Sequence, residues 1–196
     1  MTAADVRRPD VDPARELCVF VGCHHVVAAI PARFVERLVL ADEARTVSEA
    51  ASGWIIGVDK NYFPAFDLGL LVGLPKLREA WVLARWTHRG KDVVVAFSTG
   101  RCLFVQPLPK VTRLPRQLFT SRRGGIVGVF SATSVRTGRE AREGNQAREG
   151  NEAREGDEGR EGDELPAGIL LDPRRLIPEE ELERAVKQLG SKTRRT

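Results

Sequence analysis

The chain is poor in the residues that carry most metal and redox chemistry. Its 196 residues include three cysteines, three histidines and one methionine, and aromatic residues make up 6%. The cysteines, Cys18, Cys23 and Cys102, are too few for a disulfide framework and fit a reducing compartment. No stretch approaches the roughly 18 consecutive apolar residues of a membrane span, and the polar N-terminus lacks an apolar signal core. These absences predict a cytoplasmic protein without direct membrane insertion.

Motifs for metal or nucleotide binding are also missing. The sequence has no P-loop, no Gly-x-Ser-x-Gly and no dinucleotide-binding glycine fingerprint. Cys18, Cys23, His24 and His25 lie close together, but their spacing matches no zinc motif, and adjacent histidines on a strand point to opposite faces. We therefore expect no metal and no cofactor.

A nucleophilic enzyme is not indicated either. A catalytic cysteine needs a histidine and an orienting group close in space, whereas Cys23 and His24 are only neighbours in sequence. Asp67 and Asp172 each follow an apolar segment, and no third partner stands out. We expect no catalytic residue. The enzyme alternative would require a deep pocket lined by His24 and Asp67.

Charge is distributed unevenly along the chain. The net charge is +4, but residues 139–164 hold 5 Arg against 10 Asp and Glu, which leaves +9 on the remainder. Within this segment, residues 141–164 form four hexapeptides, AREGNQ, AREGNE, AREGDE and GREGDE. A segment without apolar side chains larger than Ala buries too little surface to offset chain entropy. We predict a disordered insert over residues 136–166 that joins two strands, and a disordered arm over residues 1–15.

A basic body raises the alternative of an SH3-like module that binds nucleic acid. The basic candidates surround Phe119 and are Arg113, Arg116, Arg122 and Arg123. Single-stranded nucleic acid sites combine such charges with several exposed aromatic rings. Here aromatic residues are few, so dispersed surface charge is the favoured interpretation and no nucleic-acid partner is expected.

The remaining chain reads as short strands separated by turn signals. Residues 16–31 predict two strands around Gly22, residues 32–40 a short helix or helical turn, and residues 41–52 a polar link. Residues 69–74 predict one helical turn, and Pro64 marks an edge strand or an unpaired position. Evenly spaced strands of this kind indicate small barrels or a sandwich. Further strands are predicted at residues 54–58, 62–68, 81–87, 92–98, 102–105, 125–131 and 169–171.

The C-terminal residues 178–196 predict one helix and a basic tail. Pro178 suits the first helical position, three glutamates follow it, and Gly190 is a stop signal. An apolar stripe at helical spacing predicts packing on the body of the domain, with a partner-binding helix as the alternative. The stripe consists of Leu182, Ala185, Val186 and Leu189.

The order of these segments resembles the CheW-like family of chemotaxis coupling proteins. The segments that carry the resemblance are CVFVGCHHVVAAIPARFVERLV, GWIIGV, FPAFDLGLLVGLP, WVLARWTHRGKDVVVAFST, GIVGVFSAT and GILLDPRRLI, within residues 16–177. The resemblance implies an all-β fold of two interlocked five-stranded SH3-like barrels, followed here by the C-terminal helix. It also implies a non-catalytic scaffold that docks onto a CheA-type histidine kinase, chemoreceptors or other signalling proteins.

The chain departs from the family at one turn. The family has an Asn-x-Arg-Gly turn between its Gly-Val and its Pro, whereas only five residues separate Val58 from Pro64 here, without Arg-Gly. We predict that this shorter turn and its neighbouring edge strand form the partner-binding surface. The predicted contact residues are Trp54, Lys60, Asn61 and Tyr62, with Tyr62 as anchor because aromatic residues dominate interface hot spots.

Overall fold

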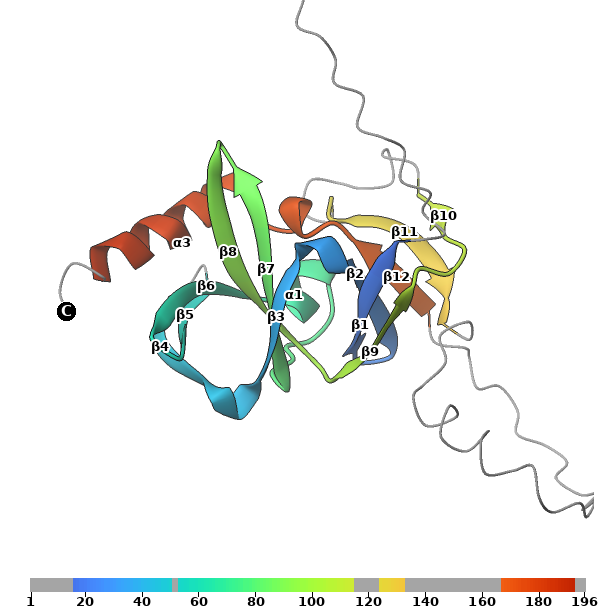
Figure 1. Cartoon of the computed structure of the whole chain (residues 1–196), viewed down its shortest axis with the longest axis horizontal. Helices are drawn as coiled ribbons and strands as arrows, with labels where there is room; N and C mark the ends of the chain where they lie inside the picture. The colour runs from blue at the N-terminus through green and yellow to red at the C-terminus, as the bar shows by residue number, and fades with distance from the viewer. Residues whose placement is uncertain (1–15, 51–52, 115–123, 133–166, 193–196) are drawn as a thin grey trace, which may run out of the picture.

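The structure is a computed structural model that describes residues 16–50, 53–114, 124–132 and 167–192 (Figure 1). The predicted arm at residues 1–15 and the repeat insert at residues 136–166 lie outside the described residues, as does the tail after Lys192. No helix of the described part is long and apolar enough to cross a bilayer.

Two six-stranded sheets build the fold. Sheet A has the order β10-β11-β12-β2-β1-β9, and sheet B has the order β3-β7-β8-β6-β5-β4. The strands of sheet A are β1 (Leu17–Cys23), β2 (Val26–Pro31), β9 (Cys102–Pro107), β10 (Thr112–Arg113), β11 (Ile126–Ser131) and β12 (Ala167–Leu171). Those of sheet B are β3 (Val35–Leu40), β4 (Ala44–Ala50), β5 (Gly53–Val58), β6 (Asn61–Asp67), β7 (Ala80–His88) and β8 (Lys91–Thr99).

The sixth strand of each sheet arises from a bend in a longer extended segment. In sheet B the two end strands, β3 and β4, are consecutive and joined by the short 3-10 helix η3 (Ala41–Glu43), so the sheet curls back on itself (Figure 1). In sheet A the end strands β9 and β10 are likewise consecutive; β9 ends at Pro107, and Pro109 lies in the segment between the two strands. The predicted five-stranded barrels therefore become six-stranded sheets, and the all-β fold with a C-terminal helix is confirmed.

The two halves of the chain repeat one order of elements and exchange their hairpins. Each half consists of a hairpin, a bent segment, two further strands and a helical turn. The hairpin β1–β2 pairs with β9 and β12 of the second half, and the hairpin β7–β8 pairs with β3 and β6 of the first. Two parallel pairs, β12 with β2 and β6 with β8, mark where the halves meet. Neither half can complete a sheet alone.

Both exchanged hairpins are buried on two faces. On β1, Phe20 points into the interior of sheet A, whereas Val19 and Val21 point into a central core between the sheets. On β7, Leu83 points into the interior of sheet B and Val82 into the same central core. Alternate side chains thus fill different cores, which is why these segments read as continuous apolar runs.

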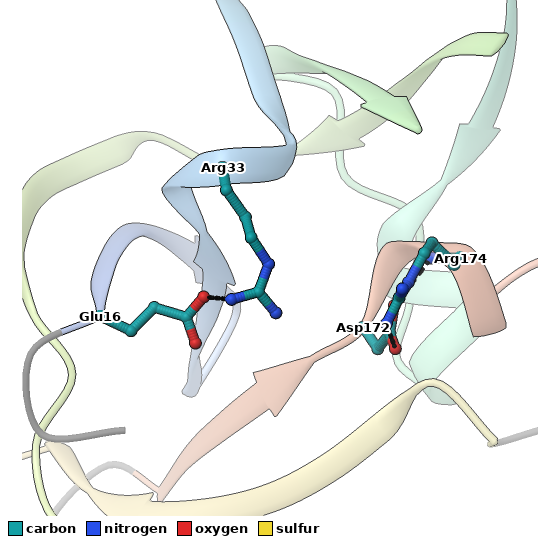
Figure 2. A network of polar contacts seen from close by, with 4 residues as sticks. All are labelled: Glu16, Arg33, Asp172 and Arg174. Atoms are coloured by element: carbon teal, nitrogen blue, oxygen red, sulfur yellow. Dashed lines mark hydrogen bonds and ion pairs between the residues drawn. The ribbon is translucent and has the colours of Figure 1, made fainter. Parts of the chain in front are cut away.

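The 3-10 helix η2 (Ala32–Phe34) connects β2 of sheet A to β3 of sheet B. The guanidinium groups of Arg33 and Arg174 both lie over the Phe34 ring, with their Cζ atoms 4.8 and 4.9 Å from its centroid. Arg33 pairs with Glu16, and Arg174 pairs with Asp172 across 2.7 Å (Figure 2). The ion pairs hold both cations against the ring, which favours cation–π attraction.

Several predicted boundaries need correction. Of the helix predicted at residues 32–40, only η2 is helical and the rest is β3; the polar link predicted at residues 41–52 contains η3 and β4. The sequence of β4, ARTVSEA, lacks clear alternation, and its pairing with β5 along the sheet supplies the stability that its composition does not. The helical turn is confirmed as α1 (Leu68–Val72), and α3 (Glu179–Lys192) continues past Gly190. Pro64 occupies a position of β6 that is not paired with β8, because pairing with β8 begins one residue later, at Ala65.

A close backbone contact between Gly22 and Gly100 gives a first test of the packing between the two sheets. The Gly100 amide donates to the Gly22 carbonyl at 2.9 Å, and a Cβ at Gly100 would lie 2.6 Å from that oxygen. We expect Gly100→Ala to lower the free energy of unfolding by about 1–3 kcal/mol, as overpacking does. Gly22→Ala is the control, because its Cβ would lie 3.8 Å from the nearest atom, the Arg101 carbonyl oxygen. Equal denaturant midpoints for the two variants would contradict this packing.

Candidate functional site

The turn between β5 and β6 is short and held from a third strand. Val58 and Asn61 pair directly, so Asp59 and Lys60 alone form the loop. Asp59 adopts a left-handed conformation, with φ of 54°, which Asp tolerates better than most residues. Its carboxylate accepts a 2.7 Å hydrogen bond from Arg37 of β3, which also raises the pKa of Arg37. The turn is therefore anchored while Lys60 and Asn61 remain exposed.

The Tyr62 ring lies against Gly57 of the neighbouring strand. Tyr62 pairs with Gly57 across β5 and β6, and a Cβ at Gly57 would lie 3.4 Å from the tyrosine ring. The same Cβ position is 3.4 Å from Val47 of β4, so the ring lies over Gly57 close to the edge strand. The Tyr62 side chain is left 38% exposed. We call Lys60, Asn61, Tyr62 and the adjoining strand β4 the turn surface.

Trp54 has a different environment from the other three predicted contact residues. It is 7% exposed and lies in the interior of sheet B, with its ring edge-on to Trp81 at a centroid distance of 6.0 Å. The Arg78 guanidinium covers it, 3.9 Å from the ring centroid. The structure thus brings Lys60, Asn61 and Tyr62 together at the surface and places Trp54 behind them. Partner contact by each of these residues stays a prediction.

The cysteine and histidine cluster noted in the sequence does not converge. Cys18 points into the interior of sheet A, whereas Cys23 points into the central core. His24 is exposed in the β1–β2 turn, where its Nε2 lies 3.2 Å from the Pro75 carbonyl oxygen. Cys23 is therefore a core residue, whereas His24 is an exposed turn residue.

Both candidate aspartates cap helical turns. The Asp67 carboxylate accepts hydrogen bonds from the Leu70 amide at 3.0 Å and the Leu77 amide at 3.2 Å. Asp172 accepts from the Arg174 amide at 3.1 Å and from its guanidinium. Asp after an apolar strand and before a helical turn is the usual capping arrangement. The contacts in the structure thus give both aspartates a capping role.

One charged cluster escaped the sequence analysis. His88, Glu179 and Glu183 present ligand-type atoms within 4.8 Å of one another, at the tip of the β7–β8 hairpin and the start of α3. The Arg89 guanidinium binds Glu179 at 2.7 Å and also contacts Glu183, so a side-chain cation already bridges the two carboxylates. The spacing of the glutamates on one helix face was visible in the sequence, but their partner lies about 90 residues away. We call His88, Arg89, Glu179 and Glu183 the clasp.

The nucleic-acid alternative gains little here. Arg113 is exposed on β10, whereas Arg116, Phe119, Arg122 and Arg123 lie outside the described residues.

Two interlocked sheets with exchanged hairpins, a shared core and a C-terminal helix define a CheW-like fold. The chain is similar to the crystal structure of the scaffolding protein TtCheW from Thermoanaerobacter tengcongensis, with a TM-score of 0.50 and 11% sequence identity over 92% of this chain and 96% of that one. No family model matches the sequence, and no curated protein matches it. The similarity to CheW proposed from the segment order is therefore confirmed at the level of the fold.

Burial separates the three thiols and yields a pH prediction. Burial raises the pKa of all three thiols, to about 12 for Cys18 and Cys23, and Cys102 is the least buried of them. We expect a thiol reagent at pH 8 to modify Cys102 first, and the other two only after denaturation. Because the folded pKa values of Cys18 and Cys23 are raised, their contribution to stability is complete below about pH 9 and is lost between about pH 9 and 12. Mass spectrometry of labelled peptides and denaturant curves across this range check both expectations.

Proposed function

We propose that the protein is a non-catalytic adaptor of a bacterial chemosensory-type signalling system. The observation that carries this proposal is the CheW-like fold, which covers 92% of the chain and matches a protein described as a scaffold. In this proposal the adaptor docks onto a CheA-type histidine kinase, onto chemoreceptors, or onto another signalling protein with a complementary surface. It acts in the cytoplasm through its outer surfaces.

The turn surface is the proposed contact site. A hot spot combines an aromatic anchor with a surrounding polar rim. Tyr62 supplies the partly exposed ring, and Lys60 and Asn61 supply polar groups beside it. β4 lies at the end of sheet B in the strand order, where extended backbone can receive a further strand.

The charge of this surface suggests which partner surface fits. Asp59 is neutralised by Arg37, so the turn surface presents two exposed cations without an ion pair among the described residues: Lys60 next to Tyr62, and Arg45 of β4, which pairs with Gly57. A complementary partner would therefore present an apolar pocket with a carboxylate at its rim. Because the Arg-Gly of the family turn is missing, we expect the partner to carry changes that match Lys60 and Tyr62.

Affinity capture from the native cell tests the proposal. We expect the tagged chain to retain a histidine kinase or chemoreceptors, identified by mass spectrometry, and Tyr62→Ala to weaken that capture about tenfold or more. Leu103→Ala is a matched control, because Leu103 is 40% exposed on sheet A and Tyr62 is 38% exposed on sheet B. Unchanged capture by Tyr62→Ala would remove the turn surface from the proposal. Capture of neither protein class would remove the chemosensory assignment.

The repeat insert is not part of the proposed adaptor surface. Its ends connect β11 to β12, whose last paired residues are Ser131 and Ala167. Deletion of residues 139–164 is expected to change the melting temperature by no more than about 2 °C, since closure entropy depends only on the logarithm of loop length. Differential scanning calorimetry measures this, and a large drop would mean that the repeats stabilise the folded domain.

A further inference from the structure

α3 covers an outer strip of sheet B beside the turn surface. The helix contacts β5 and β6, and it starts at the tip of the β7–β8 hairpin (Figure 1). Ile55 and Pro64 pair across β5 and β6 and are both buried. Their neighbours Trp54 and Ile56 point into the interior of sheet B, so Ile55 and Pro64 point outward. The strip they form adjoins the Gly57–Tyr62 pair on the same face.

The apolar contacts that hold α3 are few. Leu182 and Ala185 are 3% and 6% exposed and belong to the central core. Val186, on the same stripe, is 39% exposed, and Leu189 is only half-buried. Burial of so few side chains along 14 residues leaves the docking of the helix dependent on additional contacts.

The clasp provides those contacts at the start of the helix. Arg89 pairs with Glu179 and Glu183, and His88 lies 3.8 Å from Glu179. All four side chains are between 26% and 65% exposed. Ion pairs at this exposure contribute roughly 0–1 kcal/mol each and weaken with salt. The clasp is therefore reversible under ordinary solution conditions.

We propose that α3 is a displaceable cover of the docking face and that a partner helix of similar chemistry takes its place. This inference rests on the proposed function and adds its regulation. Displacement extends the turn surface from Tyr62 to Ile55 and Pro64, uncovers the part of the central core that Leu182 and Ala185 contact, and leaves Arg89 without carboxylate partners among the described residues. The replacement is an amphipathic helix with carboxylates one turn apart, because that is the chemistry that the strip and Arg89 accommodate in the free chain.

Hydrogen exchange on the full-length chain, without any partner, measures displacement directly. We expect Glu183→Arg to speed amide exchange in α3 and in β5–β6 by roughly three- to tenfold, through loss of one ion pair and repulsion from Arg89. Glu180→Arg is the control: it places the same charge in the first turn of the helix, and the Glu180 carboxylate forms no ion pair with the hairpin among the described residues. Combining Glu183→Arg with Arg89→Glu and Glu179→Arg should restore slow exchange, because this reversal re-forms both ion pairs of position 89 with opposite signs. Equal exchange in wild type and Glu183→Arg overturns the proposal.

A peptide added in trans tests replacement. The probe is a fluorescent synthetic peptide of residues 177–192, and the host is full-length Leu182→Asp, in which α3 loses its buried anchor. We expect saturable binding to Leu182→Asp and at least tenfold weaker binding to wild type, where the tethered helix competes at an effective concentration of about millimolar. Val186→Asp, the same change at an exposed position, should behave like wild type. If Leu182→Asp does not fold, Glu183→Arg serves as host. Binding to neither host, or equally to host and wild type, overturns the proposal, whereas failed capture of a kinase or receptor bears only on the proposed function.

Discussion

The architecture depends on burying two hairpins on both of their faces. β1–β2 and β7–β8 each send alternate side chains into the interior of one sheet and into the central core that both sheets share. Phe20 and Val21, adjacent on β1, thus contribute to different cores. Because the central core also receives Leu171 of β12 and Leu182 of α3, the sheets and the helix are stabilised by one set of apolar contacts. The two sheets are therefore parts of one cooperative unit, although each has its own interior.

The same constraint decided which elements were predictable from sequence. Segments buried on both faces, such as those around Val21 and Val95, are rich in β-branched residues and were assigned as strands. β4 was missed because it pairs with only β5 and carries Arg45, Thr46 and Ser48 instead of an apolar run. All of β3 lay within the predicted helix, since Phe34 and Leu38 also satisfy helical spacing. In both cases pairing with a neighbouring strand, which no local pattern reveals, determined the outcome.

The site was only partly accessible to sequence reasoning. The short turn at Asp59 and Lys60 could be found because Asp and Asn are typical turn residues. The location of Trp54 behind Arg78 could not, because both faces of β5 carry large side chains and only the closure of sheet B decides which face is interior. The clasp was out of reach for another reason: Arg89 and Glu183 are brought together by the docking of α3 and not by any local spacing. Long-range charge contacts of this type require the fold.

The exchange of hairpins also has a consequence for biosynthesis. A ribosome releases β1 and β2 first, but their parallel neighbour β12 ends only at Leu171, late in the chain. Until β12 emerges, one hydrogen-bonding edge of β2 has no neighbouring strand, and sheet A stays open. The nascent domain must therefore hold unpaired strand edges of sheet A until β12 has been synthesised, a state that favours association with other chains. The strands of sheet B, β3 to β8, are consecutive in the chain and can pair once Thr99 has emerged, so sheet A is the part that closes last and on which cellular factors that shield exposed strands can act.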